Sequence, residues 1–166
     1  EVDDFAKGPY WGGSGQPKEP ILWTWADTLD PPRPELETPP ELYNLDGVAY
    51  ESLILGLFTI WRGDTRVGNR EAPQNPNATV QKWQEQGREK LNEVCLGFSR
   101  DGWHWSRPER EAFIPVSEDP DAWNFGNVQS VGGGCLVVGD RLYFYASGRH
   151  PRGNTTGLAF LRRDGF

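Results

Sequence analysis

The sequence of 166 residues has no methionine and no long apolar run. Its longest apolar stretch, Leu53 to Trp61, is interrupted by Gly56 and Thr59 and falls far short of the ~20 residues that a membrane-spanning helix needs. Acidic residues outnumber basic ones by 24 to 17, and the net charge of −7 argues against a nucleic acid, whose phosphates bind a basic face. We therefore expect a soluble globular protein whose partners include neither a membrane nor a nucleic acid.

Residues that hold metals or act as nucleophiles are scarce. His104 and His150 are the only histidines, and neither has a nearby Cys or His in the sequence that would give the spacing of a zinc site. Cys95 and Cys135 lie in different predicted strands, so we expect two buried thiols, with a disulfide as the alternative. The Gly-x-Ser-x-Gly motif of serine hydrolases is absent. The sequence thus predicts no metal and no cofactor.

Aromatic residues are abundant, at 13% with eight Trp, and one aromatic phrase occurs twice. Cys95-Leu-Gly-Phe-Ser-Arg-Asp-Gly-Trp-His-Trp105 and Gly157-Leu-Ala-Phe-Leu-Arg-Arg-Asp-Gly-Phe166 share an apolar run, arginine, Asp-Gly and an aromatic residue. This order is typical of a strand that enters a tight hairpin. A chain that repeats such a phrase is built from repeated units.

The segments that precede the two copies also correspond, which predicts a four-stranded antiparallel blade repeated radially in one propeller domain. Residues 62–92 form a long polar insertion, in which we expect a helix at 79–91. Residues 1–45 are expected to form a Pro/Gly-rich arm or the end of a preceding blade, with one strand at 21–25. The first blade is expected at 46–107, with strands at 48–52, 53–61, 93–100 and 103–106. An interblade loop and an incomplete second blade are expected at 108–166, with strands at 127–131, 134–138, 141–147 and 156–161.

Several phrases carry a resemblance to a known family. Tyr43-Asn-Leu-Asp-Gly-Val-Ala-Tyr-Glu-Ser52, Asn92-Glu-Val-Cys-Leu-Gly-Phe-Ser-Arg-Asp-Gly-Trp-His-Trp105 and Gly139-Asp-Arg-Leu-Tyr-Phe-Tyr145 resemble bacterial proteins grouped beside glycoside hydrolase family 32. They are similar to the five-bladed propellers of the family 32, 43 and 130 group. The family 32 motifs Asn-Asp-Pro-Asn and Arg-Asp-Pro are not found.

The resemblance implies an all-β fold, a five-bladed β-propeller with a sugar site on its axis. This chain would supply about two to two and a half of the blades, so more polypeptide, from the same or a partner chain, is expected to close the ring. Because the sequence begins at Glu1 without methionine, we expect the original start to be missing. The cellular location is left open, with a secreted or periplasmic one favoured.

The resemblance also implies that Glu51, expected on the innermost strand, is the general acid of a glycosidase. The alternative is that Glu51 pairs with Arg62 or Arg149 inside the channel. Asp46 is the second catalytic candidate, although the surrounding residues also suit a turn. In contrast, Asp101 is expected at the opposite face, in a structural turn that resembles a shortened Asp-box of sialidases.

Aromatic rings that stack on sugar CH faces and side chains that bond hydroxyls are expected to line the funnel beside these acids. The alternative is a structural role, with Trp123 in the core and His150 in a loop hydrogen bond. The candidate substrate-binding residues are Tyr50, Trp61, Arg62, Trp123, Asn127, Gln129, Arg149 and His150. The predicted function is a carbohydrate-active glycoside hydrolase acting on an oligosaccharide or glycoside, with a non-catalytic carbohydrate-binding propeller or a protein-interaction propeller as the alternatives.

Overall fold

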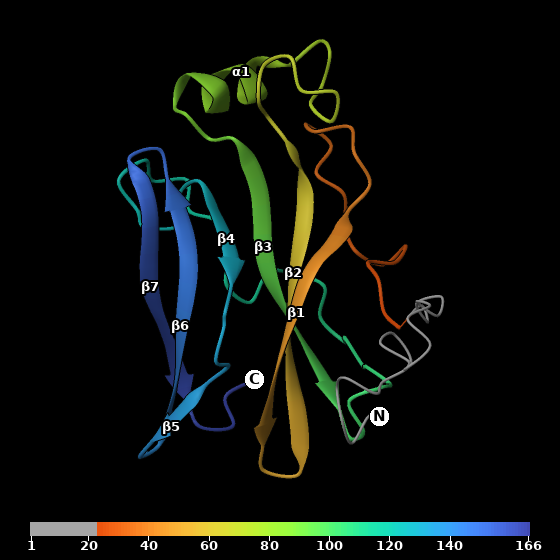
Figure 1. Ribbon diagram of the computed structural model, residues 1–166, viewed down its shortest axis with the longest axis vertical. Coiled ribbons are helices and arrows are strands. Elements are labelled where there is room, and N and C mark those ends of the chain that lie inside the picture. Colours follow the sequence, from red (N-terminus) through yellow and green to blue (C-terminus); the bar gives the residue numbers. More distant parts are fainter. Residues whose placement is uncertain (1–22) are drawn as a thin grey trace, which may run out of the picture.

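The computed structural model describes residues 23–166, which form two antiparallel β-sheets and one short helix (Figure 1). The prediction of an all-β, antiparallel protein is thereby confirmed, whereas the number of blades stays a prediction. The elements are β1 Glu41–Tyr50, β2 Leu53–Asp64, α1 Ala78–Glu85, β3 Lys90–Ser99, β4 Asn127–Ser130, β5 Leu136–Val138, β6 Arg141–His150 and β7 Gly153–Arg162.

The first sheet has the order β1-β2-β3. In the second sheet β6 is central and β7 pairs along one side of it. The other side of β6 is shared, because β4 pairs with residues 147–149 and β5 with residues 141–143. Since β4 and β5 lie along the same edge, they act together as one interrupted strand, and each sheet has three strand positions.

The two sheets repeat the same cross-strand register. In the first sheet Leu57 of β2 lies opposite Leu96 of β3, and in the second Tyr145 of β6 lies opposite Leu158 of β7. The two copies of the repeated phrase therefore run through β3 and β7, the third strand of each unit. This agrees with the prediction that the repeat is architectural.

The main core lies between the two sheets, which stand side by side in Figure 1. Leu55 and Leu57 of β2 meet Leu142, Phe144 and Ala146 of β6, and all five side chains are fully buried. Because β-strand side chains alternate between faces, each strand contributes every second residue to this layer. Burial of such side chains contributes about 1.5–3 kcal/mol each and holds the sheets together.

Helix α1 is shorter than the expected helix at 79–91. It begins after Asn77, whose side-chain Oδ1 accepts a hydrogen bond from the backbone N of Val80 at 3.0 Å. The helix ends because Gly87 adopts a φ of +75°, and Lys90 then enters β3. Val80 and Trp83 anchor α1 in a small core of its own.

Three of the expected strands differ from the structure. The first strand begins at Glu41, directly after Pro39 and Pro40, and ends at Tyr50, so the expected bounds of 48–52 for this strand are wrong. The expected edge strand at 103–106 is reduced to a single bridge between Ser106 and Phe98. Of the expected strand at 21–25, residues 23–25 are not in a strand, and the rest lies outside the described residues.

Within residues 23–166, no helix is long and apolar enough to cross a membrane. Cys95 and Cys135 are both free thiols, as expected; Cys95 is buried and Cys135 is half-buried. Burial raises the pKa of the Cys95 thiol, which keeps it protonated and unreactive at neutral pH.

Candidate functional site

The two ends of the sheets differ in construction. We call the end where β2 and β6 finish and β1 and β4 begin the insertion end, because the segment 65–89 with α1 connects β2 to β3 there. The opposite end, with the short turns after β1, β3, β5 and β7, we call the turn end. In Figure 1 the insertion end carries α1 at the top and the β1–β2 turn lies at the bottom.

Toward the insertion end, three strands contain an extra residue that interrupts the pairing. These are Tyr43 in β1, Gln129 in β4 and Arg62 in β2, each of which lies at a register shift. A β-bulge bends the strand and re-aims the side chain of the extra residue, and bulges are common beside active sites.

Two of the bulged residues meet where β1 and β4 come together. The hydroxyl oxygen of Tyr43 accepts a hydrogen bond from Nε2 of Gln129 at 3.0 Å. The Oε1 atom of Gln129 in turn accepts from Nε of Arg149 at 2.8 Å. The ammonium of Lys90 lies 4.6 Å from the centre of the Tyr43 ring, a cation–π distance. These contacts join β1 and β3 of the first sheet to β4 and β6 of the second.

Asp46 belongs to the same surface. Asp46 follows Tyr43 by three positions, so a regular strand would place them on opposite faces, but the bulge at Tyr43 lets both reach β4 and the residue that follows it. The Oδ2 atom of Asp46 accepts from the backbone N of Val131 at 2.8 Å and from Nδ2 of Asn44 at 3.1 Å. These two donors fix the orientation of the carboxylate. We call Tyr43, Asp46, Gln129, Arg149 and Lys90 the inner-strand cluster.

Two pockets adjoin this cluster. One, of about 270 Å³, is lined by Tyr43, Lys90 and Trp61 among others. The second, of about 350 Å³, is lined by Asn127, Arg149 and Glu89 among others. Asn127 is only 2% exposed, and its Oδ1 has no hydrogen-bond partner among residues 23–166. Because a buried unpaired acceptor costs free energy, this amide is suited to receive a hydrogen bond from a bound hydroxyl.

The structure brings six of the predicted site residues to this region, and it separates the others from it. The six residues on the cluster or on its adjoining pockets are Asp46, Trp61, Asn127, Gln129, Arg149 and His150.

Glu51 is not on an inner strand, so its predicted placement is wrong. Tyr50 and Leu53 form the last pair of the β1–β2 hairpin, which leaves Glu51 in the connecting turn with a φ of +50°. Its carboxylate is exposed and forms an ion pair with Arg163, rather than with the Arg62 or Arg149 proposed as alternative partners. Its catalytic role is not tested by this placement and stays a prediction.

Tyr50 also lies at the turn end. It is buried, and its hydroxyl donates a hydrogen bond to Oδ1 of Asp164. This bond raises the pKa of the Tyr50 hydroxyl, and the edge of the ring packs on Phe166 with the ring centres 5.9 Å apart. Tyr50 therefore fixes the second copy of the repeated phrase to the β1–β2 hairpin, away from the inner-strand cluster.

Arg62, expected to face the funnel, is 2% exposed and occupied by protein partners. Its Nη1 donates to the carbonyl of Pro31 at 2.8 Å, and its Nε lies 3.5 Å from the Glu93 carboxylate. The bulge re-aims this side chain inward, where it ties the segment before β1 to the first sheet.

Trp123 and His150 both make structural contacts, and their substrate-binding roles stay predictions. Trp123 lies against Gly148 and Gly157, where an added Cβ would approach its ring to 2.7 Å and 2.1 Å. Both ring nitrogens of His150 are engaged, with Nε2 at 2.6 Å from the carbonyl of Pro120 and Nδ1 at 3.0 Å from the backbone N of Arg152. This pairing defines the neutral imidazole with the proton on Nε2.

Sequence reasoning did not assign Tyr43 or Lys90 to the site. Tyr43 belongs to the first sequence segment that carries the family resemblance. The sequence predicts a strand only from Val48, so Tyr43 falls outside the predicted strand. Lys90 is the first residue of β3 and directly follows the insertion. No local pattern relates these two positions, because their contact depends on the closure of the 65–89 segment.

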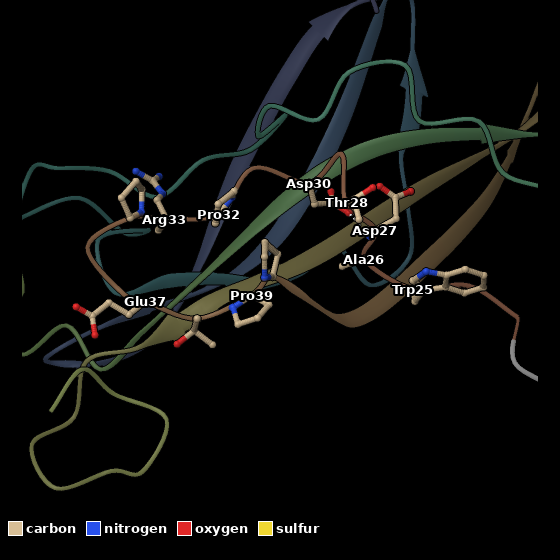
Figure 2. A pocket seen from close by; sticks show the side chains of 12 residues that line it. Trp25, Ala26, Asp27, Thr28, Asp30, Pro32, Arg33, Glu37 and Pro39 are labelled. Carbon is tan, nitrogen blue, oxygen red and sulfur yellow. Dashed lines mark hydrogen bonds between the residues drawn. The ribbon is translucent and has the colours of Figure 1, made fainter.

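A cavity of about 840 Å³ lies elsewhere, among residues 25–40 (Figure 2). Its two aspartates are committed to ion pairs. Asp27 lies 2.8 Å from Nη1 of Arg110, and Asp30 accepts from Nη1 of Arg107 at 3.0 Å. Asp30 is 2% exposed, so this ionic network fastens the segment before β1 to the first sheet and leaves little carboxylate chemistry for a ligand.

No group of three or more His, Cys, Asp and Glu side chains suited to a metal ion occurs in the described part of the chain. Neither the protein-family models nor the curated proteins with which the sequence was compared match it.

Two solved structures are similar. A glycosyl hydrolase from Bacteroides ovatus aligns with a TM-score of 0.49 and 12% identity over 75% of this chain and 29% of its own. The beta-1,2-mannobiose phosphorylase from Listeria innocua, solved with beta-1,2-mannobiose, aligns with a TM-score of 0.48 and 13% identity over 75% of this chain and 42% of its own. The chain spans less than half the length of either structure.

Proposed function

We propose that the inner-strand cluster is the carbohydrate site of a β-propeller protein and that the protein acts as a glycoside hydrolase. The observation that carries the proposal is the hydrogen-bonded chain from Tyr43 through Gln129 to Arg149, with Asp46 beside it on β1. In the proposed whole protein, further polypeptide completes a five-bladed ring around this surface.

The chemistry of the cluster suits a neutral ligand rich in hydroxyl groups. Tyr43 offers an exposed aromatic face and a hydroxyl that both donates and accepts. Gln129 and Arg149 offer amide and guanidinium groups, and the orphan Oδ1 of Asn127 accepts from a donor. Sugars present both CH faces and hydroxyls of either polarity, which this combination matches.

Hydrolysis of a glycosidic bond ordinarily needs two carboxyl groups, one of which donates a proton to the leaving oxygen. Asp46 accepts hydrogen bonds from the backbone N of Val131 and from the side chain of Asn44, which hold its carboxylate in a fixed orientation beside the cluster. We assign Asp46 the role of base or nucleophile and not that of the proton donor proposed for Glu51. The proton donor would come from another blade facing the same funnel.

The test is hydrolysis of a panel of aryl glycosides and short oligosaccharides by the protein in its complete form. We expect Asp46→Asn to lower kcat/KM by about 100-fold or more, because loss of a base or nucleophile removes the step that it performs. The comparison variant is Glu51→Gln at the turn end: a rate within about twofold of wild type supports the inner-strand cluster, whereas a loss of about 100-fold or more would support the general-acid role predicted for Glu51. Equal rates for Asp46→Asn and wild type would contradict the assignment.

A non-catalytic carbohydrate-binding site is the second candidate. It is favoured by the same two hydrogen bonds to Asp46. A carboxylate that accepts from two protein donors can have a structural role, in which it positions Val131 and Asn44 and takes no part in bond cleavage. Under this alternative a glycan binds with measurable affinity by calorimetry, whereas no member of the panel is cleaved.

A further inference from the structure

Another cavity, of about 420 Å³, lies at the turn end, beside the turn that follows β3. Its volume falls within the ~300–1,000 Å³ that is usual for small-molecule sites. It shares no lining residue with the two pockets beside the inner-strand cluster. We call it the turn-end cavity, and it is a separate candidate site.

The walls of the turn-end cavity are largely apolar. They include Leu53 of β2, Phe98 of β3 and the indole of Trp105. The Trp105 ring is fixed by packing, because an added Cβ at Gly56 would approach it to 2.5 Å and the ring of Phe58 meets it edge-on, with the ring centres 5.4 Å apart. The apolar wall is therefore formed before any ligand enters.

The Asp101 carboxylate lines the cavity, but both of its oxygens are engaged within the turn. Its Oδ1 accepts from the hydroxyl of Ser99 at 3.1 Å and from the backbone N of Trp103 and of His104 at 2.8 Å. Its Oδ2 lies 2.7 Å from Nδ1 of His104, so a protonated His104 ring keeps Nε2 as a donor for another partner. Asp101 thus builds the wall and orients His104, which also lines the cavity.

Two further polar groups of the cavity lack an acceptor. The indole Nε1 of Trp105 is buried and has no hydrogen-bond partner among residues 23–166. The guanidinium of Arg100 is exposed and forms no ion pair with these residues, whereas its neighbour Asp101 pairs with His104. A buried donor without a partner costs free energy, and a guanidinium binds carboxylates through paired N–H groups. A ligand that satisfies both groups must bring an oxygen acceptor with negative charge.

We propose that the turn-end cavity binds a carboxylate that carries an apolar body, such as an aromatic acid. The carboxylate accepts from the indole of Trp105 and pairs with Arg100 and His104. The apolar body packs on Leu53 and Phe98 and is removed from water. This ligand differs in chemistry from a neutral sugar, so the inference does not depend on the proposed carbohydrate function.

The test is an NMR titration of the ¹⁵N-labelled 166-residue chain with phenylacetate, followed at the indole N–H signal of Trp105. The signal is assigned by its loss in Trp105→Phe. We expect a saturable shift of this signal, with roughly tenfold weaker binding of phenylacetamide, which lacks the charge, and of acetate, which lacks the ring. N-acetylphenylalanine represents the C-terminus of a peptide, and tighter binding of this probe than of phenylacetate would support the proposal with a peptide carboxylate as the source.

Arg100→Gln separates a built site from a general affinity of the surface for anions. Because Arg100 is exposed, the variant keeps the fold, and we expect the Kd for phenylacetate to rise by about tenfold. The matched control is Arg70→Gln, which removes an exposed arginine from the insertion and should leave the Kd within about twofold.

Three results would overturn the proposal. The first is the absence of a saturable shift of the Trp105 indole signal at millimolar phenylacetate. The second is equal binding of phenylacetate, phenylacetamide and acetate, since the cavity would then select neither the charge nor the ring. The third is an unchanged Kd in Arg100→Gln, or an equal loss in Arg70→Gln.

Discussion

The insertion end and the turn end differ in how their polar side chains are used. At the turn end Asp101 accepts hydrogen bonds from the backbone N of both Trp103 and His104 at 2.8 Å, and its other oxygen contacts the His104 ring. Toward the insertion end Tyr43 and Gln129 are linked by a single bond between two bulged residues. At the turn end aspartate and aromatic residues thus close turns, whereas toward the insertion end they leave hydrogen-bonding capacity on an exposed surface.

Breaking the hydrogen-bonded chain Tyr43–Gln129–Arg149, toward the insertion end, is expected to have the largest effect, on glycan affinity. Gln129→Ala removes the group that bonds both neighbours, and we expect glycan affinity to fall by about tenfold, the equivalent of ~1.4 kcal/mol. Isothermal calorimetry with the tightest-binding oligosaccharide of the panel measures the change. Asp101→Ala is the control from the turn end, and an equal loss of affinity in that variant would remove the distinction between the ends.

A smaller effect is expected on stability at the turn end. The pKa of Asp101 lies well below its usual range because the His104 side chain and the backbone N–H groups of His104 and Trp103 bond the carboxylate. A depressed native pKa adds stability above the unfolded value of about 3.9, and that stability is lost as the pH falls toward the native pKa. Asp101→Ala should therefore lower Tm by a few degrees at neutral pH.

The pH dependence provides the check on this prediction. Thermal unfolding followed from pH 7 to pH 2 should show the Tm difference between wild type and Asp101→Ala shrinking below about pH 4, because the unfolded wild-type chain there binds a proton that the native carboxylate does not. A difference that stays constant over the whole range would mean that the carboxylate charge does not support the turn.

The smallest effect is expected for the exposed ion pair between Glu51 and Arg163. Surface ion pairs contribute little to stability because water and salt screen them. Glu51→Gln should change neither Tm nor glycan affinity beyond the error of the measurement. A large loss of glycan affinity in this variant would move the site from the insertion end to the turn end.

Much of the strand framework could be predicted from the sequence. The Asp-Gly turns and the apolar runs before them placed β3 and β7, and the same reasoning placed most of β2 and β6. These segments follow the period-two alternation or the continuous apolar pattern of buried strands, which needs only local sequence.

The site could be predicted only in part, and the reason is physical. The bulge at Tyr43 breaks the alternation of β1, so the sequence from Glu41 onward does not look like a strand and the strand was expected to start at Val48. That shift moved Glu51 from the turn onto the strand. The feature that builds the inner-strand cluster is therefore the one that conceals it from a pattern-based prediction.

The contacts between strands also escape local patterns. Asn127, Gln129 and Arg149 were predicted because their strand ends share one end of the second sheet. The hydrogen bond from Gln129 to Tyr43 depends instead on how the two sheets pack, which places β1 next to β4. The inward turn of Arg62 is a second example, because its burial follows from the bulge after Trp61 and from the carbonyl of Pro31.

The most direct test of the central claim is a backbone NMR titration of the labelled protein with the oligosaccharide that it binds most tightly. If the ligand site is the inner-strand cluster, the largest shift changes will fall on the amides of residues 43–46, 127–131 and 149, while those of residues 50–52 and 99–104 stay in place. Shift changes concentrated at the turn end, with the inner-strand cluster unaffected, would contradict the account.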